Sequence, residues 1–82
     1  MIRDIEYDNI ICNRINELRL ERGLSIEALA YQSGLSKGGI SEILNLKKGP
    51  CSLTIAKICS CLGITLSQFY DFKEINHYLS QL

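Results

Sequence analysis

The sequence predicts a compact all-α domain, because turn-forming residues divide the chain into short segments whose apolar residues recur at helical spacing. Strict alternation of apolar and polar residues, which is typical of strands, is absent from these segments. The turn-forming positions are Gly23, Gly34, Gly38-Gly39, Gly49-Pro50 and Gly63. With 82 residues the chain has the size of one domain, residues 1–82, and we expect five or six short helices.

The first helix is expected over residues 8–22, with Asp8 or Asn9 as its N-cap and Gly23 as its left-handed stop. Three apolar residues at spacings of four and three form its inward face, namely Ile11, Ile15 and Leu18. This helix is the start of a predicted domain core that extends over about residues 8–71.

Two short helices are expected next, capped by Ser25 and Ser36, and the first of them ends at Gly34. Their predicted inward residues are Leu29, Ala30, Ile40, Ile43 and Leu44. A fourth helix is predicted over residues 52–62 and ends at Gly63. Its predicted inward residues are Ile55, Ile58, Cys59 and Leu62.

The C-terminal part is predicted to hold a short helix that Ser67 caps and that contains Phe69, followed by a helical tail over residues 72–82. The tail has an apolar stripe at helical spacing, made of Phe72, Ile75, Leu79 and Leu82. Two interpretations are open. The stripe is a contact in a homodimer, or it folds back on the core of its own chain.

Composition and charge exclude several classes of protein. The apolar fraction of 46% and the charged fraction of 22% are typical of a globular chain rather than a disordered one. The longest uncharged stretch, residues 58–70, is too short and too polar to span a membrane. The first eight residues carry three acidic side chains, unlike a secretory leader, so a cytoplasmic location is expected. Nine basic residues balance nine acidic ones, which argues against a non-specific polyanion binder.

The cysteines and the histidine do not form a pattern typical of a metal or catalytic site. Cys59 and Cys61 are separated by one residue, no second close pair exists, and on a helix the two would point about 200° apart. We therefore expect Cys12, Cys51, Cys59 and Cys61 to be reduced, buried filler, and His77 to lie on the surface. Neither a cofactor nor a small-molecule ligand is indicated, and no nucleophile–base pair predicts an enzyme.

The most informative stretch is residues 26–45, which fits two helices joined by a tight turn. Ala30 is small where the second helix of the pair must approach closely, and Gly34 tolerates the positive φ of the turn. Leu35 covers the corner, while Ile40 and Ile43 hold the following helix on the core. In this order and spacing the five residues predict a helix-turn-helix unit.

Here the sequence resembles the Cro/CI-type (XRE-type) helix-turn-helix regulators. The similarity covers residues 11–71, with the matching text RINELRLERGLSIEALAYQSGLSKGGISEILN followed by GPCSLTIAKICSCLGITLSQFYDF. The resemblance implies a lambda-repressor-like DNA-binding domain that acts as a homodimer on a two-fold symmetric operator. Its third helix would lie in the major groove of double-stranded DNA.

The same helical geometry assigns candidate roles on the third helix. If Ile40 and Ile43 face the core, the outward candidates for reading bases are Lys37, Gly38, Ser41 and Glu42. A lysine at this position donates to guanine O6 or N7, a glutamate accepts from cytosine N4, and a serine is permissive. The candidates for phosphate contact are Ser25 and Ser36, through the amides behind them, together with Asn45, Lys47 and Lys48.

Three departures from the family pattern bear on these roles. Ile26 stands where the family commonly has a phosphate-holding glutamine, and Leu44 stands where it often has a glutamate paired with the arginine that matches Arg19. Arg19 is therefore expected to be at least partly exposed. Gly38-Gly39 removes two side chains from the reading end of the third helix.

Two functions follow from these observations. The first is a sequence-specific DNA-binding transcriptional regulator that acts as a homodimer. The alternative is a protein-interaction module that retains the helix-turn-helix fold without binding DNA, which Ile26, Gly38-Gly39 and the zero net charge favour.

Overall fold

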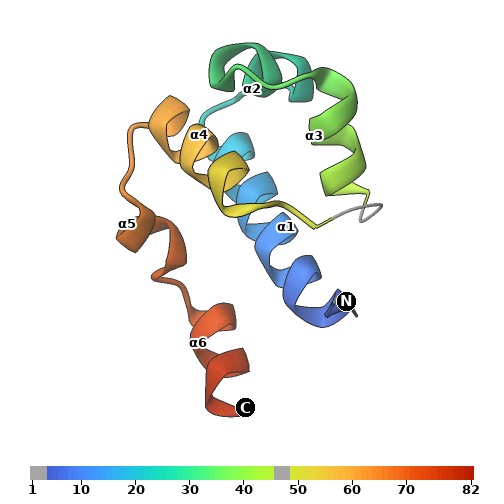
Figure 1. Cartoon of the computed structure of the whole chain (residues 1–82). Helices are drawn as coiled ribbons and strands as arrows, with labels where there is room; N and C mark the ends of the chain where they lie inside the picture. Colours follow the sequence, from blue (N-terminus) through green and yellow to red (C-terminus); the bar gives the residue numbers. More distant parts are fainter. Residues whose placement is uncertain (1–3, 46–48) are drawn as a thin grey trace.

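The computed structural model describes residues 4–45 and 49–82, and within these ranges the chain is helical (Figure 1). The helices are α1 (Ile5–Glu21), α2 (Ile26–Ser33), α3 (Lys37–Leu44), α4 (Ser52–Leu62), α5 (Leu66–Tyr70) and α6 (Lys73–Ser80). The described ranges contain no strand, so the all-α prediction is confirmed. None of the helices in these ranges has both the length and the apolar character that crossing a membrane requires.

Two predicted N-caps are wrong. Helix α1 begins one turn earlier than residue 8, because the Asp4 carboxylate accepts from the Tyr7 amide at 3.0 Å and caps the helix there. Asp8 is therefore inside the helix, and its amide donates to the Asp4 carbonyl. Ser67 is not the cap of α5 either, since a capping box of Thr65 and Gln68 starts that helix at Leu66.

The predicted N-caps of α2 and α3 and the three predicted glycine stops are confirmed. Ser25 and Ser36 cap α2 and α3 through their hydroxyls, which accept from the Ala28 and Gly39 amides, both at 3.0 Å. The left-handed stops follow α1, α2 and α4 at Gly23, Gly34 and Gly63, with φ of +64°, +73° and +71°. Glycine takes this conformation without the steric penalty that a Cβ imposes.

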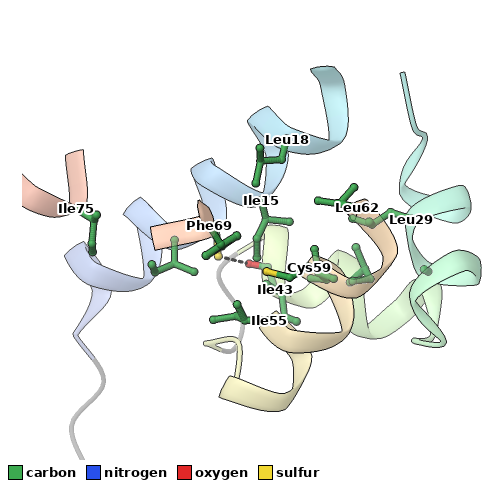
Figure 2. Close-up of a cluster of buried hydrophobic side chains, with 14 residues drawn as sticks. Ile15, Leu18, Leu29, Ile43, Ile55, Cys59, Leu62, Phe69 and Ile75 are labelled. Carbon is green, nitrogen blue, oxygen red and sulfur yellow. Dashed lines mark hydrogen bonds between the residues drawn. The ribbon is translucent and has the colours of Figure 1, made fainter. Parts of the chain in front are cut away.

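The core lies between α1, α2, α3 and α4, and Figure 2 shows its side chains converging from these helices and from α5. Its most buried residues are Ile11, Ile15, Leu29, Ile40, Ile58 and Phe69. Cys12 and Cys59 fill part of this core as reduced thiols, as predicted. The prediction is wrong for Cys51, which is exposed because it occupies the N-cap position of α4, outside the helix.

Helix α6 packs against α1, beside its N-terminal half in Figure 1. Ile75 is buried in the core and Phe72 packs against it, so these two members of the tail stripe fold back on their own chain. Leu79 and Leu82 remain exposed, at 53% and 85%. The interpretation that the stripe folds back on its own chain is therefore confirmed for Phe72 and Ile75, whereas a homodimer contact through Leu79 and Leu82 stays a prediction.

Arg14 of α1 joins α5 and α6 to the rest of the chain. Its guanidinium donates to the Phe69 and Gln68 carbonyls at 2.9 and 3.0 Å, near the C-terminal end of α5. The same group lies 4.8 Å from the centroid of the Phe72 ring, at the start of α6. One side chain therefore fixes the point at which the chain turns into α6.

Tyr78 fixes the other end of α6. Its ring packs on Tyr7, with centroids 5.6 Å apart, and its hydroxyl donates to the Asp4 carboxylate. This hydrogen bond lowers the pKa of Asp4 and, as the largest cause, raises the pKa of Tyr78 to about 12. The hydrogen bond is strongest while the carboxylate is ionised and the phenol is protonated.

We expect Tyr78→Phe to lower the melting temperature at neutral pH, because it removes this hydrogen bond and keeps the ring. Since the folded pKa of Asp4 is depressed, the contribution of the pair is present above the ordinary carboxyl pKa of about 3.9 and is lost as pH falls through the folded value. Since the folded pKa of Tyr78 is raised, the contribution is also lost between about pH 10 and the folded pKa of about 12.

The measurement is thermal denaturation by circular dichroism from about pH 2.5 to 8, with Tyr7→Phe as a control that keeps the ring contact and the Asp4–Tyr78 bond. The deficit of Tyr78→Phe against wild type should shrink toward the acid end. A deficit of constant size across this range would show that the hydroxyl acts independently of the Asp4 charge.

Candidate nucleic-acid interface

Helices α2 and α3 form a two-helix unit whose turn is fixed by backbone geometry. Gly34 takes positive φ. The Gly34 amide donates to the Tyr31 carbonyl at 3.3 Å and the Leu35 amide donates to the Ala30 carbonyl at 2.9 Å, so both amides of the turn bond to the end of α2. Ala30 is buried on α2, which packs on α3. The small side chain and the bending glycine thus occupy the places that the sequence predicts for them.

Helix α3 is held on the domain along one side only, as far as the described residues show. Ile40 and Ile43 are 1% and 4% exposed, and the helix contacts α2 and α1. The Cys12 thiol donates to the Ile43 carbonyl at 3.0 Å, which is the dashed line in Figure 2. In Figure 1, α3 and α6 lie on opposite sides of α1, so α6 leaves the outer side of α3 uncovered.

The outer side of α3 carries the predicted base-reading residues. Lys37, Gly38 and Glu42 are exposed, and Ser41 is half-buried. Asn45, which follows the helix, is also exposed and donates to the Ser41 hydroxyl at 3.3 Å. The structure thus brings all five onto one continuous surface at the edge of the domain.

The starts of α2 and α3 supply backbone donors beside this surface. These donors are the first-turn amides of residues 26–27 and 37–38, which have no intrahelical acceptor. Such amides bind anions at helix N-termini. The other two predicted phosphate contacts, Lys47 and Lys48, lie outside the described residues.

Lys37 has a partner that the sequence analysis missed. Its ammonium lies 3.3 Å from a carboxylate oxygen of Glu27, and the two side chains are 64% and 73% exposed. Glu27 is the second residue of α2 and Lys37 is the first residue of α3. Pairing rules for neighbours three or four residues apart do not reach a partner ten residues away, so only the helix-turn-helix geometry reveals it.

Two of the departures from the family pattern have structural explanations. Arg19 is half-buried, as expected, and donates to the Asn16 amide oxygen and to the Leu24 carbonyl, both at 2.7 Å. These two acceptors take the place of the glutamate that the family often has at the position of Leu44. Ile26 is half-buried against the core, so its side chain contributes packing at the start of α2.

Comparison with known proteins agrees with this geometry. Residues 14–74 match the Cro/C1-type HTH DNA-binding domain, which is most of the chain. The protein belongs to this family. Membership agrees with the prediction that the chain is not an enzyme, since this is a family of DNA-binding domains.

The relatives of this Cro/C1-type domain are named as regulators. This chain is 36% identical over 61 residues to the HTH-type transcriptional regulator PuuR of Escherichia coli. The matched region covers 74% of this chain and 33% of that protein. The chain is 31% identical over 74 residues to the HTH-type transcriptional regulator SinR of Bacillus subtilis, covering 89% and 67%. The chain thus spans a third of the length of PuuR.

Two solved structures share the fold. An HTH_3 family transcriptional regulator from Vibrio cholerae has a TM-score of 0.80 and 32% identity, covering 96% of this chain and 43% of that one. A point mutant of the restriction-modification controller protein C.Esp1396I has a TM-score of 0.78 and 25% identity, covering 92% and 96%. The lambda-repressor-like fold class is therefore confirmed.

We expect Gly38→Ala to stabilise this Cro/C1-type domain by about 0.4–1 kcal/mol, because glycine is a poor helix former and raises the entropy of the unfolded chain. A Cβ at Gly38 meets no atom within 4 Å. Gly39→Ala is the matched control, since its Cβ would lie 3.0 Å from the Ser36 hydroxyl oxygen that caps α3. Urea denaturation should give the larger gain for Gly38→Ala, and equal gains would contradict the structural distinction.

Proposed function

We propose that this protein is a sequence-specific DNA-binding transcriptional regulator that acts as a homodimer and inserts α3 into the major groove. The observation that carries the proposal is the outer side of α3: Ile40 and Ile43 anchor the helix, while Lys37, Gly38 and Glu42 are exposed along it. A helix that stands out from a domain in this way fits the width of the major groove. The family and the regulators among its relatives support the same function.

The proposed roles follow from hydrogen-bonding capacity. Lys37 donates to guanine O6 or N7, Glu42 accepts from cytosine N4, and Ser41 contacts either kind of base. Gly38 allows the backbone to approach the base edges closely, since it has no side chain to hold the groove away. Because few side chains read bases, part of the specificity is expected to come from the deformability of the DNA.

Contacts to phosphates are proposed at the starts of α2 and α3 and after the end of α3. The first-turn amides behind Ser25 and Ser36 receive phosphate oxygens at the two helix starts. Asn45, Lys47 and Lys48 follow the end of α3 and are expected to fix the register of the helix without reading sequence. Since such contacts release counterions, affinity should fall steeply as salt rises.

The homodimer is proposed to form through the exposed end of the tail stripe. Ile75 and Phe72 are occupied in their own core, which leaves Leu79 and Leu82 as the members available to a second copy. In Figure 1 this end of α6 lies away from α3, so a contact there leaves the DNA-reading side of each copy open. A two-fold arrangement would place two α3 helices about one turn of DNA apart.

The decisive test of DNA recognition is selection of bound duplexes from a random pool at low and moderate salt, followed by measurement of Lys37→Ala on the selected duplex. We expect an enriched motif with two-fold symmetry. Lys37→Ala should weaken binding by roughly 1–3 kcal/mol and relax the preference at one base pair per half-site. Lys73→Ala removes an equivalent charge from the first position of α6 and should leave the preference intact.

Absence of any binding at low salt would reject the regulator and favour the protein-interaction module. An equal loss on random and selected duplexes for Lys37→Ala would mean that Lys37 does not read a base.

For the dimer, we expect Leu79→Glu to shift the protein from dimer to monomer in sedimentation, because it places a charge in a contact that must exclude water. Its exposure of 53% keeps the change outside the core. Leu53→Glu is the matched control on α4, where the leucine is 62% exposed, and should remain dimeric. A Leu79→Glu protein that sediments as wild type would move the interface elsewhere.

A further inference from the structure

The ion pair between Glu27 and Lys37 bears directly on DNA binding, because it engages the cation to which we assign the guanine contact. The following inference rests on the proposed function and deepens it. The Lys37 ammonium and the Glu27 carboxylate are 3.3 Å apart, and the pair links the first turn of α2 to the first turn of α3. It therefore lies between the two sets of backbone amides proposed to receive phosphates.

A carboxylate in this place resembles a phosphate oxygen in its chemistry. It is an anion in the first turn of α2, where the helix dipole favours negative charge, and it accepts from a lysine at the first position of α3. DNA offers the same lysine either phosphate oxygens or the O6 and N7 acceptors of guanine. The ammonium has three N–H donors, but the carboxylate holds one of them and neutralises part of the charge that DNA would otherwise meet.

We infer that Glu27 is an internal competitor of DNA for Lys37. In the free protein it holds the ammonium against α2, and a duplex must compete with this contact for the charge of Lys37. Glu27 thus lowers the affinity of the protein for DNA and sets how much of the charge of Lys37 contributes to binding.

The exposure of the pair determines the size of the effect. Both side chains are more than half exposed, and ion pairs of this kind are weak. The contact is therefore easily displaced, yet its loss should change affinity by about two- to five-fold.

The test compares Glu27→Gln with Glu74→Gln. Both replace an exposed glutamate at the second position of a helix, and both raise the net charge by one. Dissociation constants are measured against the duplex selected above over a range of salt, for wild type, the two single variants, Lys37→Ala and the double variants that combine Lys37→Ala with each. Thermal denaturation of each variant confirms that it is folded.

We expect Glu27→Gln to bind about two- to five-fold more tightly than Glu74→Gln, with a salt slope steeper by up to about 0.9, the value for one further phosphate contact. In the Lys37→Ala background the advantage should disappear, because the competed cation is gone.

Three results would overturn the inference while leaving the proposed function in place. The first is equal binding by Glu27→Gln and Glu74→Gln, which would mean that the carboxylate does not affect affinity. Weaker binding by Glu27→Gln would equally overturn it, since the carboxylate would then position Lys37 for DNA. The third is an undiminished advantage in the Lys37→Ala background, which would mean general repulsion. If wild type binds no duplex, the proposed function fails and the inference with it.

Discussion

The rotation of α3 about its own axis is the constraint on which the candidate DNA-binding surface depends. Ile40 and Ile43 must both be buried, and on a helix of eight residues this leaves one possible outer side. Ala30 and Gly34 set how closely and at what angle α3 meets α2, and the Cys12 thiol fixes its far end through the Ile43 carbonyl. Residues away from the outer side of α3 thus decide which side chains of the helix lie on that side.

Helix faces and helix stops were predictable from the sequence because each is specified locally. Apolar spacing identifies a face, and a glycine that accepts positive φ identifies a stop. Two helix starts were not predictable, because more than one residue near each of them has a side chain suited to capping. Asp4 and Asp8 are both able to cap α1, and Thr65 and Ser67 are both able to cap α5, so composition alone does not choose between them. The choice depends on where packing lets the chain enter each helix.

The candidate surface was predictable as a list of outward residues but not as a set of interactions. Lys37 was expected on the outer side of α3, and it is there, yet its pairing with Glu27 depends on the angle between two helices. Arg14 reaches carbonyls more than fifty residues away, and Tyr78 reaches Asp4 across almost the whole chain. Contacts at such separations have no periodic signal, and they are the ones that position α6 and tune the charge of the reading side.

Because α3 carries few outward side chains, a contact made to one of them by another helix has a large effect on the charge of this surface. Two consecutive glycines leave Lys37 as the lysine in the first turn of this helix and Glu42 as the carboxylate further along it. With so few outward side chains on this helix, a neighbour that neutralises Lys37 alters the charge of the surface more than it would on a helix rich in arginine. The balance of charge across the helix-turn-helix, rather than the net charge of the chain, therefore decides the electrostatic potential at this surface.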